Sequence, residues 1–131
     1  MKLSRNVIAL GVALVVNVLV VILLTPLGFE TRPATELKTV GYIAIGTIFA
    51  GLALFVVSFA LLFMRVRLAS SLAIVGSILF FFPIVGDKGG AFFSLPIPPV
   101  IETLENILVV VLLVTLFLAS RVYRENNPSP S

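Results

Sequence analysis

The chain has 131 residues, of which 60% are hydrophobic and 11% are charged, and its formal net charge is +3. A soluble domain carries about 25% charged residues, and a chain this short leaves much of its surface exposed. The composition therefore excludes a water-soluble globular protein, and an intrinsically disordered one as well, since disorder requires low hydrophobicity.

The sequence contains neither cysteine nor histidine. Disulfides, thiol redox chemistry, zinc sites and histidine-ligated haem are thereby excluded. We expect no cofactor, no bound metal and no enzymatic activity. The basic character of the chain comes from scattered loop residues, whereas nucleic-acid binding requires a clustered basic face, so we expect no nucleic-acid partner.

The first apolar run covers 7–24 and is interrupted only by Asn17. About 20 residues of helix cross the hydrocarbon core, so this run predicts a membrane span. A cleaved signal peptide is the alternative, because Lys2 and Arg5 give it a basic start. Pro26 stands where a small-residue cleavage site should follow, which favours an uncleaved helix.

The next two runs predict helices at 35–64 and 68–86. Pro33 and Glu36 suit a helix that begins before the membrane, because proline fits a first turn and a carboxylate favours the positive end of the dipole. Pro83 lies near the end of the third helix, where proline usually kinks or ends a helix. Only Arg65, Val66 and Arg67 separate the two apolar runs, so the helices must be antiparallel neighbours.

The fourth helix is predicted at 99–120. Its uninterrupted apolar core, 107–119, would by itself also suit a buried or re-entrant segment. Pro99 can open the helix, and Glu102 and Glu105 then lie near its positive end, so that the full length spans the membrane. The remaining chain forms predicted outer loops at 25–34 and 87–98 and a disordered tail at 125–131.

The charges give the orientation. With four spans and a cytoplasmic N-terminus, six basic residues and one acidic residue lie inside, against three basic and five acidic residues outside. Basic residues in short loops stay cytoplasmic. We therefore predict an all-α membrane protein: a single integral membrane domain over 1–131, in which four transmembrane helices form an antiparallel bundle in the cell membrane, with both termini cytoplasmic.

The apolar runs within the four predicted helices are 7–24, 40–64, 68–86 and 107–119, and they contain no charged residue. This absence argues against proton relays, ion-coupled carriers and voltage sensors. Asn17 is the one strongly polar side chain within these runs. It shares a helix face with Ala9 and Ala13, so we interpret it as a hydrogen-bonding contact between helices, with a substrate or ion contact as the alternative.

Small residues three to four positions apart indicate close helix packing. The second helix has Gly46 with Ala50, and the third has Ala69, Ala73 and Ser77. The fourth is almost entirely valine and leucine. We therefore predict that helices one to three pack tightly and that the fourth is peripheral.

The loop at 87–98 is unusually apolar. We expect it to lie in the membrane interface or to fold back over the bundle; docking to a partner protein or a lipid-like ligand is the alternative. The residues that would make this contact are Phe92, Phe93, Leu95 and Ile97. Glu102 and Glu105, three residues apart, could act as an acid–base pair or bind a cation, but a helix-terminus role is the preferred interpretation.

These features favour a small, non-enzymatic accessory or structural membrane protein. It would associate through its helix faces or its apolar outer loop, with the lipid bilayer, other membrane subunits or further copies of itself as partners. The alternative is a minimal oligomeric channel or carrier for a neutral or apolar solute.

Overall fold

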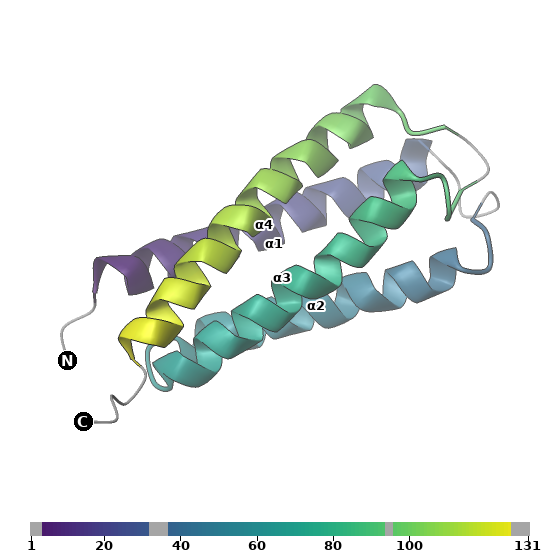
Figure 1. Cartoon of the computed structure of the whole chain (residues 1–131). Helices are drawn as coiled ribbons and strands as arrows, with labels where there is room; N and C mark the ends of the chain where they lie inside the picture. The colour runs from purple at the N-terminus through teal and green to yellow at the C-terminus, as the bar shows by residue number, and fades with distance from the viewer. Residues whose placement is uncertain (1–3, 32–36, 94–95, 127–131) are drawn as a thin grey trace.

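The computed structural model describes residues 4–31, 37–93 and 96–126, and this part of the chain folds into four helices (Figure 1). The helices run alternately up and down. The described ends of the chain and the α2–α3 turn therefore lie at one end of the bundle, here called the terminal end. The α1–α2 and α3–α4 connections lie at the other, the loop end. The helices are α1 (Arg5–Thr31), α2 (Gly41–Leu61), α3 (Val66–Lys88) and α4 (Pro99–Glu125).

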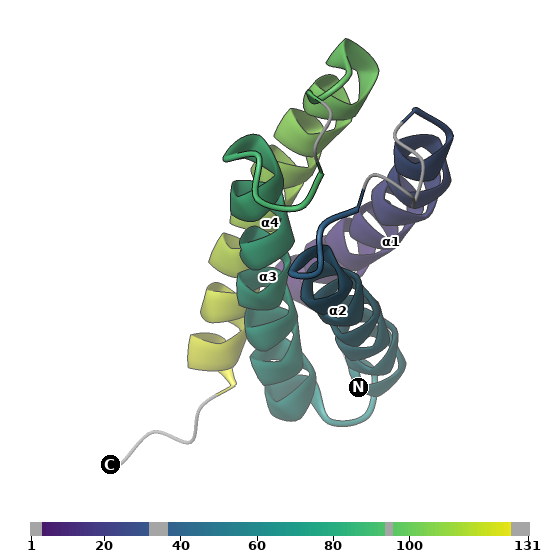
Figure 2. The same ribbon diagram turned by 90° about the vertical axis from the view of Figure 1, so that its right-hand side faces the viewer.

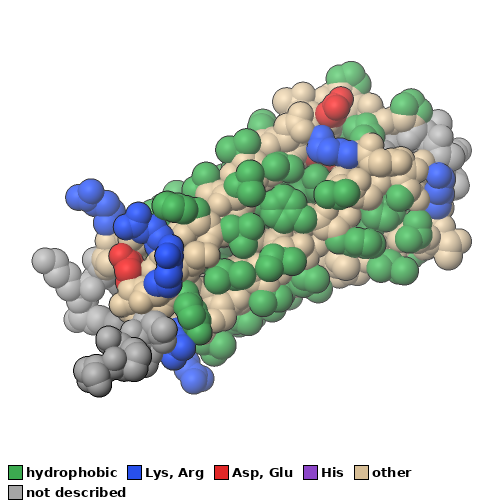
Figure 3. Space-filling view, in the orientation of Figure 1, with side chains coloured by type: hydrophobic (Ala, Val, Ile, Leu, Met, Phe, Trp, Pro, Cys, Tyr) green, Lys and Arg blue, Asp and Glu red, His purple; other side chains and the backbone are tan. Residues whose placement is uncertain are grey.

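Each helix is long and apolar enough to cross a membrane. The prediction of an all-helical chain with four candidate membrane spans is thereby confirmed. Apolar side chains cover the middle of the surface seen in Figure 3, whereas lysine and arginine gather near the ends, most densely at the terminal end. Such a surface suits contact with the hydrocarbon of a bilayer.

Two helices continue through prolines, and only the first of them was predicted to end before its proline. We predicted a loop from residue 25, but α1 runs through Pro26 to Thr31. Pro26 is exposed, and the Thr25 hydroxyl donates a hydrogen bond of 2.9 Å to the Val21 carbonyl one turn earlier. Hydrogen bonds of this kind help membrane helices to tolerate proline. Likewise α3 continues through the buried Pro83 to Lys88.

The other helix bounds differ more modestly. Helix α2 begins at Gly41 rather than 35, after a turn at 39–40, while 32–36 fall outside the described residues. Helix α4 begins at Pro99 as predicted and continues to Glu125, so it enters the segment predicted as a disordered tail. Positions 127–131 of that tail are also outside the described residues.

The buried side chains recur at alternating intervals of three and four residues. This spacing places one stripe of each helix against its neighbours, as in coiled coils and helix bundles. In α3 the stripe consists of Val66, Ala69, Ala73, Gly76, Phe80, Pro83 and Asp87. In α4 it consists of Ile101, Glu105, Leu108, Leu112, Thr115, Ala119 and Val122.

The fourth helix is not peripheral, which corrects our prediction. It packs extensively against both α1 and α3, whereas the contact between α1 and α2 is the weakest of the four neighbouring pairs. Valine and leucine suit lipid and protein contacts equally well, so the composition of α4 could not reveal its position.

Two phenylalanines and two glycines hold α2 and α3 together. A Cβ atom added at Gly51 would lie 2.6 Å from the Phe80 ring, and one added at Gly76 would lie 2.9 Å from the Phe55 ring. Because the helices are antiparallel, each Gly-x-x-x-Phe segment places its ring over the other helix's glycine. The two ring centroids lie 5.2 Å apart. We call these four residues the Gly–Phe lock.

The small residues predicted to pack helices fall into two groups. Ala13, Ala69, Ala73 and Ser77 are buried, and Ala9 is half-buried. In contrast, Gly46 and Ala50 are exposed, and a Cβ atom at Gly46 would have no neighbour within 4 Å among the described residues. Among the described residues these two therefore do not belong to the buried contacts between helices, which corrects their assignment within the bundle.

Candidate functional site

A cavity of about 140 Å³ occupies the loop-end half of the bundle. All four helices contribute to it: Val21 from α1, Ala44 from α2, Phe80 from α3 and Leu108 from α4 are among the lining residues. The side chains around it are predominantly apolar. A mostly apolar concave space with a few polar groups is typical of small-molecule sites.

The two loop-end connections cover this cavity. Leu37 and Phe93 form an isolated antiparallel bridge, and the Lys38 amide donates a hydrogen bond of 2.6 Å to the Phe92 carbonyl. The Phe92 ring is buried over Gly86 and lies 5.7 Å from the Phe82 ring, between centroids. The described part of the loop therefore folds over the bundle.

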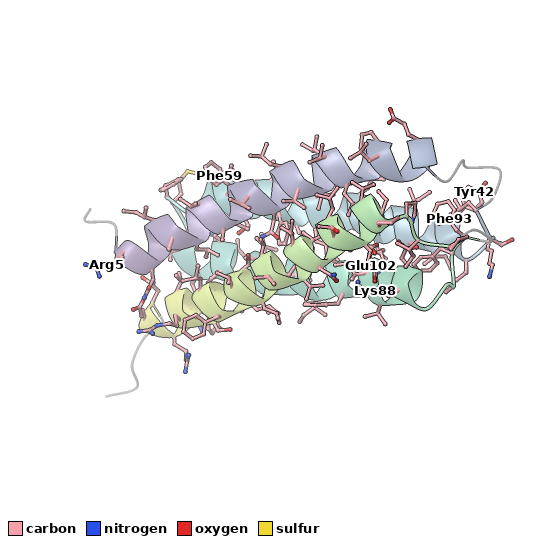
Figure 4. All side chains as sticks on the ribbon, turned by 90° about the horizontal axis from the view of Figure 1, so that it is seen from above. Arg5, Tyr42, Phe59, Lys88, Phe93 and Glu102 are labelled. Carbon is pink, nitrogen blue, oxygen red and sulfur yellow. The ribbon has the colours of Figure 1, made fainter. Side chains whose placement is uncertain are left out.

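The other predicted loop residues are less enclosed. Phe93 and Ile97 are half-buried, and Leu95 lies outside the described residues. Figure 4 shows Phe93 and Tyr42 at the loop end, opposite Arg5. Phe92 and Phe93 line the cavity, whereas Ile97 does not. The loop residues singled out from the sequence thus form part of the cover of the cavity, together with Leu37.

Lysines tie the connections to the bundle at this end. Lys38 Nζ donates a hydrogen bond of 3.1 Å to the Gly90 carbonyl, and Lys88 Nζ donates one of 2.7 Å to Asn106 Oδ1. The second bond joins the end of α3 to the beginning of α4. It therefore holds together the two helix ends that carry the acidic side chains of the cavity.

Asp87 and Glu105 are those acidic side chains. They are only 7% and 4% exposed, and both line the cavity. Glu102, one turn before Glu105, is exposed (Figure 4). Glu102 lies in the first turn of α4, as the helix-terminus interpretation requires, whereas Glu105 faces inward and lines the cavity.

The sequence contains a signal for both buried acids that the apolar runs alone do not reveal. Asp87 continues the three–four spacing of Phe80 and Pro83, and Glu105 stands in the same spacing between Ile101 and Leu108. Each carboxylate therefore continues the inward stripe of its helix. The apolar runs miss this signal because the third ends before Asp87 and the fourth begins after Glu105.

Asn17 forms a separate polar contact in the middle of the bundle. Its Nδ2 donates hydrogen bonds of 2.6 Å to Thr115 Oγ1 of α4 and 2.9 Å to the Ala13 carbonyl of its own helix. The Thr115 hydroxyl in turn donates to the Val111 carbonyl at 2.7 Å. Both side chains are fully buried, neither lines the cavity, and Asn17 Oδ1 accepts no hydrogen bond from the described residues.

The other interior hydroxyl groups donate to backbone carbonyls. Ser77 donates to Ala73 at 2.8 Å, and Thr47 donates to Ala44 at 2.8 Å. Ser58 of α2 donates to the Ala69 carbonyl of α3 at 2.7 Å, which ties these helices together near their turn. None of the three hydroxyl side chains lines the cavity.

Polar contacts at the terminal end lie on the surface. Arg67 donates a hydrogen bond of 3.0 Å to the Tyr123 hydroxyl, and its guanidinium carbon is 4.9 Å from the centroid of that ring. Asn6 Nδ2 donates to Glu125 Oε2 at 2.9 Å. These contacts join α3 to α4 and α1 to α4. Over the described residues, no three acidic side chains gather closely enough to hold a metal ion.

Comparison with models of known protein families, with curated proteins and with solved structures gives no match. The function must therefore be argued from the residues themselves. What is shown is the architecture: four apolar helices compatible with a small integral membrane protein.

Proposed function

We propose that this chain is a multi-pass protein of the cell membrane that acts as a non-enzymatic accessory or structural component. The observation that carries the proposal is the distribution of surface. Large apolar side chains are exposed along all four helices, whereas the mid-bundle polar groups, such as Asn17 and Thr115, bond within the bundle. An exposed apolar surface of this extent suits contact with lipid or with other membrane helices.

We further propose that both termini are cytoplasmic. Among the described residues, five arginines lie near the helix ends or in the turn at the terminal end, whereas the loop end carries two lysines. Basic residues flanking membrane spans stay in the cytoplasm. The arginines are Arg5, Arg65, Arg67, Arg121 and Arg124, and the lysines are Lys38 and Lys88.

A cysteine-scanning experiment tests the orientation, because the chain has no native cysteine. In intact cells, a membrane-impermeant maleimide should label Ala91→Cys in the exposed loop and leave Asn126→Cys at the terminal end unlabelled. After permeabilisation both should react. The reverse pattern would contradict the proposed orientation, and recovery of the chain in the aqueous fraction would contradict membrane insertion.

The outward face of α2 is the candidate surface for association. Gly46 and Ala50 are exposed there, together with Ala53 one turn further on. Small residues let the backbone of a second helix approach closely where lipid supplies no hydrophobic driving force. This face supports association with another membrane protein or with a second copy of the chain.

Crosslinking in the native membrane tests this association. Gly46→Leu should abolish a crosslinked partner or dimer without affecting folding, because a side chain there meets nothing in the bundle. Ile78→Ala on the exposed face of α3 is the control and should have no effect. A crosslinking pattern that is unchanged in Gly46→Leu would contradict the role of this face.

A carrier for a neutral or apolar solute is the second candidate, because the cavity is a specific observation in its favour. Reconstituted protein should then transport solute across liposomes without any partner. Against a pore, the hydroxyl groups of Thr47, Ser58 and Ser77 bond to backbone carbonyls and none lines the cavity. Solute flux from the purified chain would favour the carrier over the accessory role.

A further inference from the structure

The cavity lies between α1 and α2 in the loop-end half of the bundle. At the terminal half these helices touch: a Cβ atom added at Gly11 would lie 3.3 Å from Leu62. Toward the loop end, α1 stands apart from α3 (Figure 2), and the cavity lies between Val21 of α1 and Ala44 of α2. Phe49, which is 62% exposed, also lines it. The cavity therefore reaches the lateral surface of the bundle beside α2.

The size of the cavity limits what it can hold. A cavity of about 150 Å³ lined by leucine, isoleucine and phenylalanine is large enough to bind benzene. The present cavity, of about 140 Å³, has the same kind of lining, including Phe80, Ile84 and Leu108. Its capacity is therefore close to that of one aromatic ring.

The carboxylates add a polar requirement. Asp87 and Glu105 are its charged lining groups among the described residues. A carboxyl group carries acceptor oxygens in either protonation state, so it can accept a hydrogen bond from a ligand in addition to its other contacts. We consider a neutral donor, because moving a neutral group into apolar surroundings costs much less desolvation than moving a charged one.

We propose that the cavity binds a neutral aromatic molecule with one hydrogen-bond donor, of the phenol class, which enters from the bilayer between α1 and α2. The ring occupies the space beside Ala44 and Phe80, and the hydroxyl group donates to the carboxylate of Glu105. The proposal deepens the second candidate function by naming its ligand. It rests on membrane insertion for the entry route, whereas binding itself depends only on the folded bundle.

Fluorine NMR on the purified full chain in lipid nanodiscs tests the proposal with 4-fluorophenol and its near-isostere 4-fluorotoluene. Empty nanodiscs supply the background from partitioning into lipid. We expect saturable binding of 4-fluorophenol, about tenfold tighter than that of 4-fluorotoluene, because only the phenol forms a hydrogen bond to the Glu105 side chain. Absence of saturable binding to the folded protein would overturn the proposal.

A matched pair of variants on α2 tests the location. Ala44→Leu fills the cavity, whereas Ala60→Leu makes the same chemical change at an exposed position near the other end of the same helix. We expect Ala44→Leu to weaken binding at least tenfold and Ala60→Leu to leave it unchanged. Equal effects of the two changes would show that the cavity is not the binding site.

A second pair tests the acceptor. Glu105→Met removes the acceptor oxygens at similar size and should reduce the preference for the phenol over the toluene to nearly onefold, while Glu102→Met, at the exposed neighbour, should retain it. A merely structural role of Glu105 would weaken both ligands together and leave the preference intact, which would overturn the assignment. Circular dichroism and gel filtration establish folding, and if Glu105→Met fails to fold, the α2 pair still decides the proposal.

Ligand binding and solute transport can be tested separately. Binding without solute flux in liposomes would contradict the carrier and leave the ligand site standing. Flux that persists in Ala44→Leu would contradict the ligand site and leave transport standing. Because the same titration can be made in detergent micelles, binding is also measured independently of whether the chain inserts in the cell membrane.

Discussion

The two halves of this bundle differ in packing although both are built from similarly apolar helices. From the terminal end to its middle, the bundle is closely packed: Phe55 fits against Gly76, Gly11 against Leu62, and Asn17 bonds to Thr115. Toward the loop end, α1 and α2 separate, and the cavity receives two carboxylates.

Hydropathy alone cannot account for this difference. In the closely packed half, a glycine faces a ring or a branched side chain, so the backbones can approach one another. In the other half, Ala44 and Val21 are too small to fill the space between α1 and α2, and the connections cover what remains. The first half therefore holds the helices together, whereas the second leaves room for a ligand.

The largest expected effect comes from breaking the Gly–Phe lock. Gly76→Leu forces a side chain into the space of the Phe55 ring and should lower the free energy of unfolding by about 3 kcal/mol. Denaturant titration in mixed micelles measures it. Gly46→Leu is the control and should cost far less, since its site is open; similar losses in both variants would contradict the lock.

Filling the cavity should change the free energy of unfolding in the opposite direction. Ala44→Leu should raise the free energy of unfolding by about 1 kcal/mol, because cavity-filling changes commonly stabilise proteins. The same change at Ala73, which is fully buried between packed helices, should be destabilising. The same titration checks both variants. If Ala44→Leu destabilised the chain as much as Ala73→Leu does, the two halves would not differ in packing as described.

The Asn17–Thr115 contact should contribute less. Measured hydrogen bonds between membrane helices average about 0.6 kcal/mol, and we expect a coupling energy of that size from a double-mutant cycle of Asn17→Leu and Thr115→Val. The gain is modest partly because Asn17 Oδ1 is buried without a donor among the described residues. Stability that stays unchanged in Asn17→Leu would remove its role in helix association.

The smallest effect is expected at the surface of the terminal end. Tyr123→Phe removes the hydrogen bond from Arg67 but keeps the ring beneath the guanidinium, so the loss should be about 0.5 kcal/mol. Thermal unfolding in detergent can resolve it against Arg67→Ala, which also removes the cation–π contact. A larger loss of stability in Tyr123→Phe than in Arg67→Ala would contradict this division of the energy between the hydrogen bond and the cation–π contact.

The sequence was sufficient to predict the number and order of the helices. Long apolar runs predict spans because hydrocarbon requires about 20 apolar residues per crossing. It was less informative about helix ends: the first helix was predicted to end before Pro26, yet α1 continues past it to Thr31. Proline is compatible with a membrane helix where neighbouring helices, Ser and Thr side chains or water satisfy the backbone groups that it frees.

The candidate site was harder to predict. An exposed ring is costly, which draws attention to Phe92, but nothing in the sequence indicates that it covers a cavity shared by four helices. The negative charge of Glu105, considered without the spacing of its apolar neighbours, predicts a position at the helix terminus. The alternating intervals that bury Leu108 and Leu112 also bury Glu105, and the same periodicity places α4 inside the bundle.

The pairing of α1 with α4 has a consequence for how the protein is made. The ribosome completes α1 first and α4 last, so under the proposed membrane insertion Asn17 enters the bilayer before it can pair with Thr115. The α2–α3 hairpin, by contrast, can close as soon as its own two helices emerge. The last step of assembly is therefore the pairing of α1, which is synthesised first, with α4, which is synthesised last. A chain that terminates before α4 would leave an amide in lipid, where quality control could recognise it.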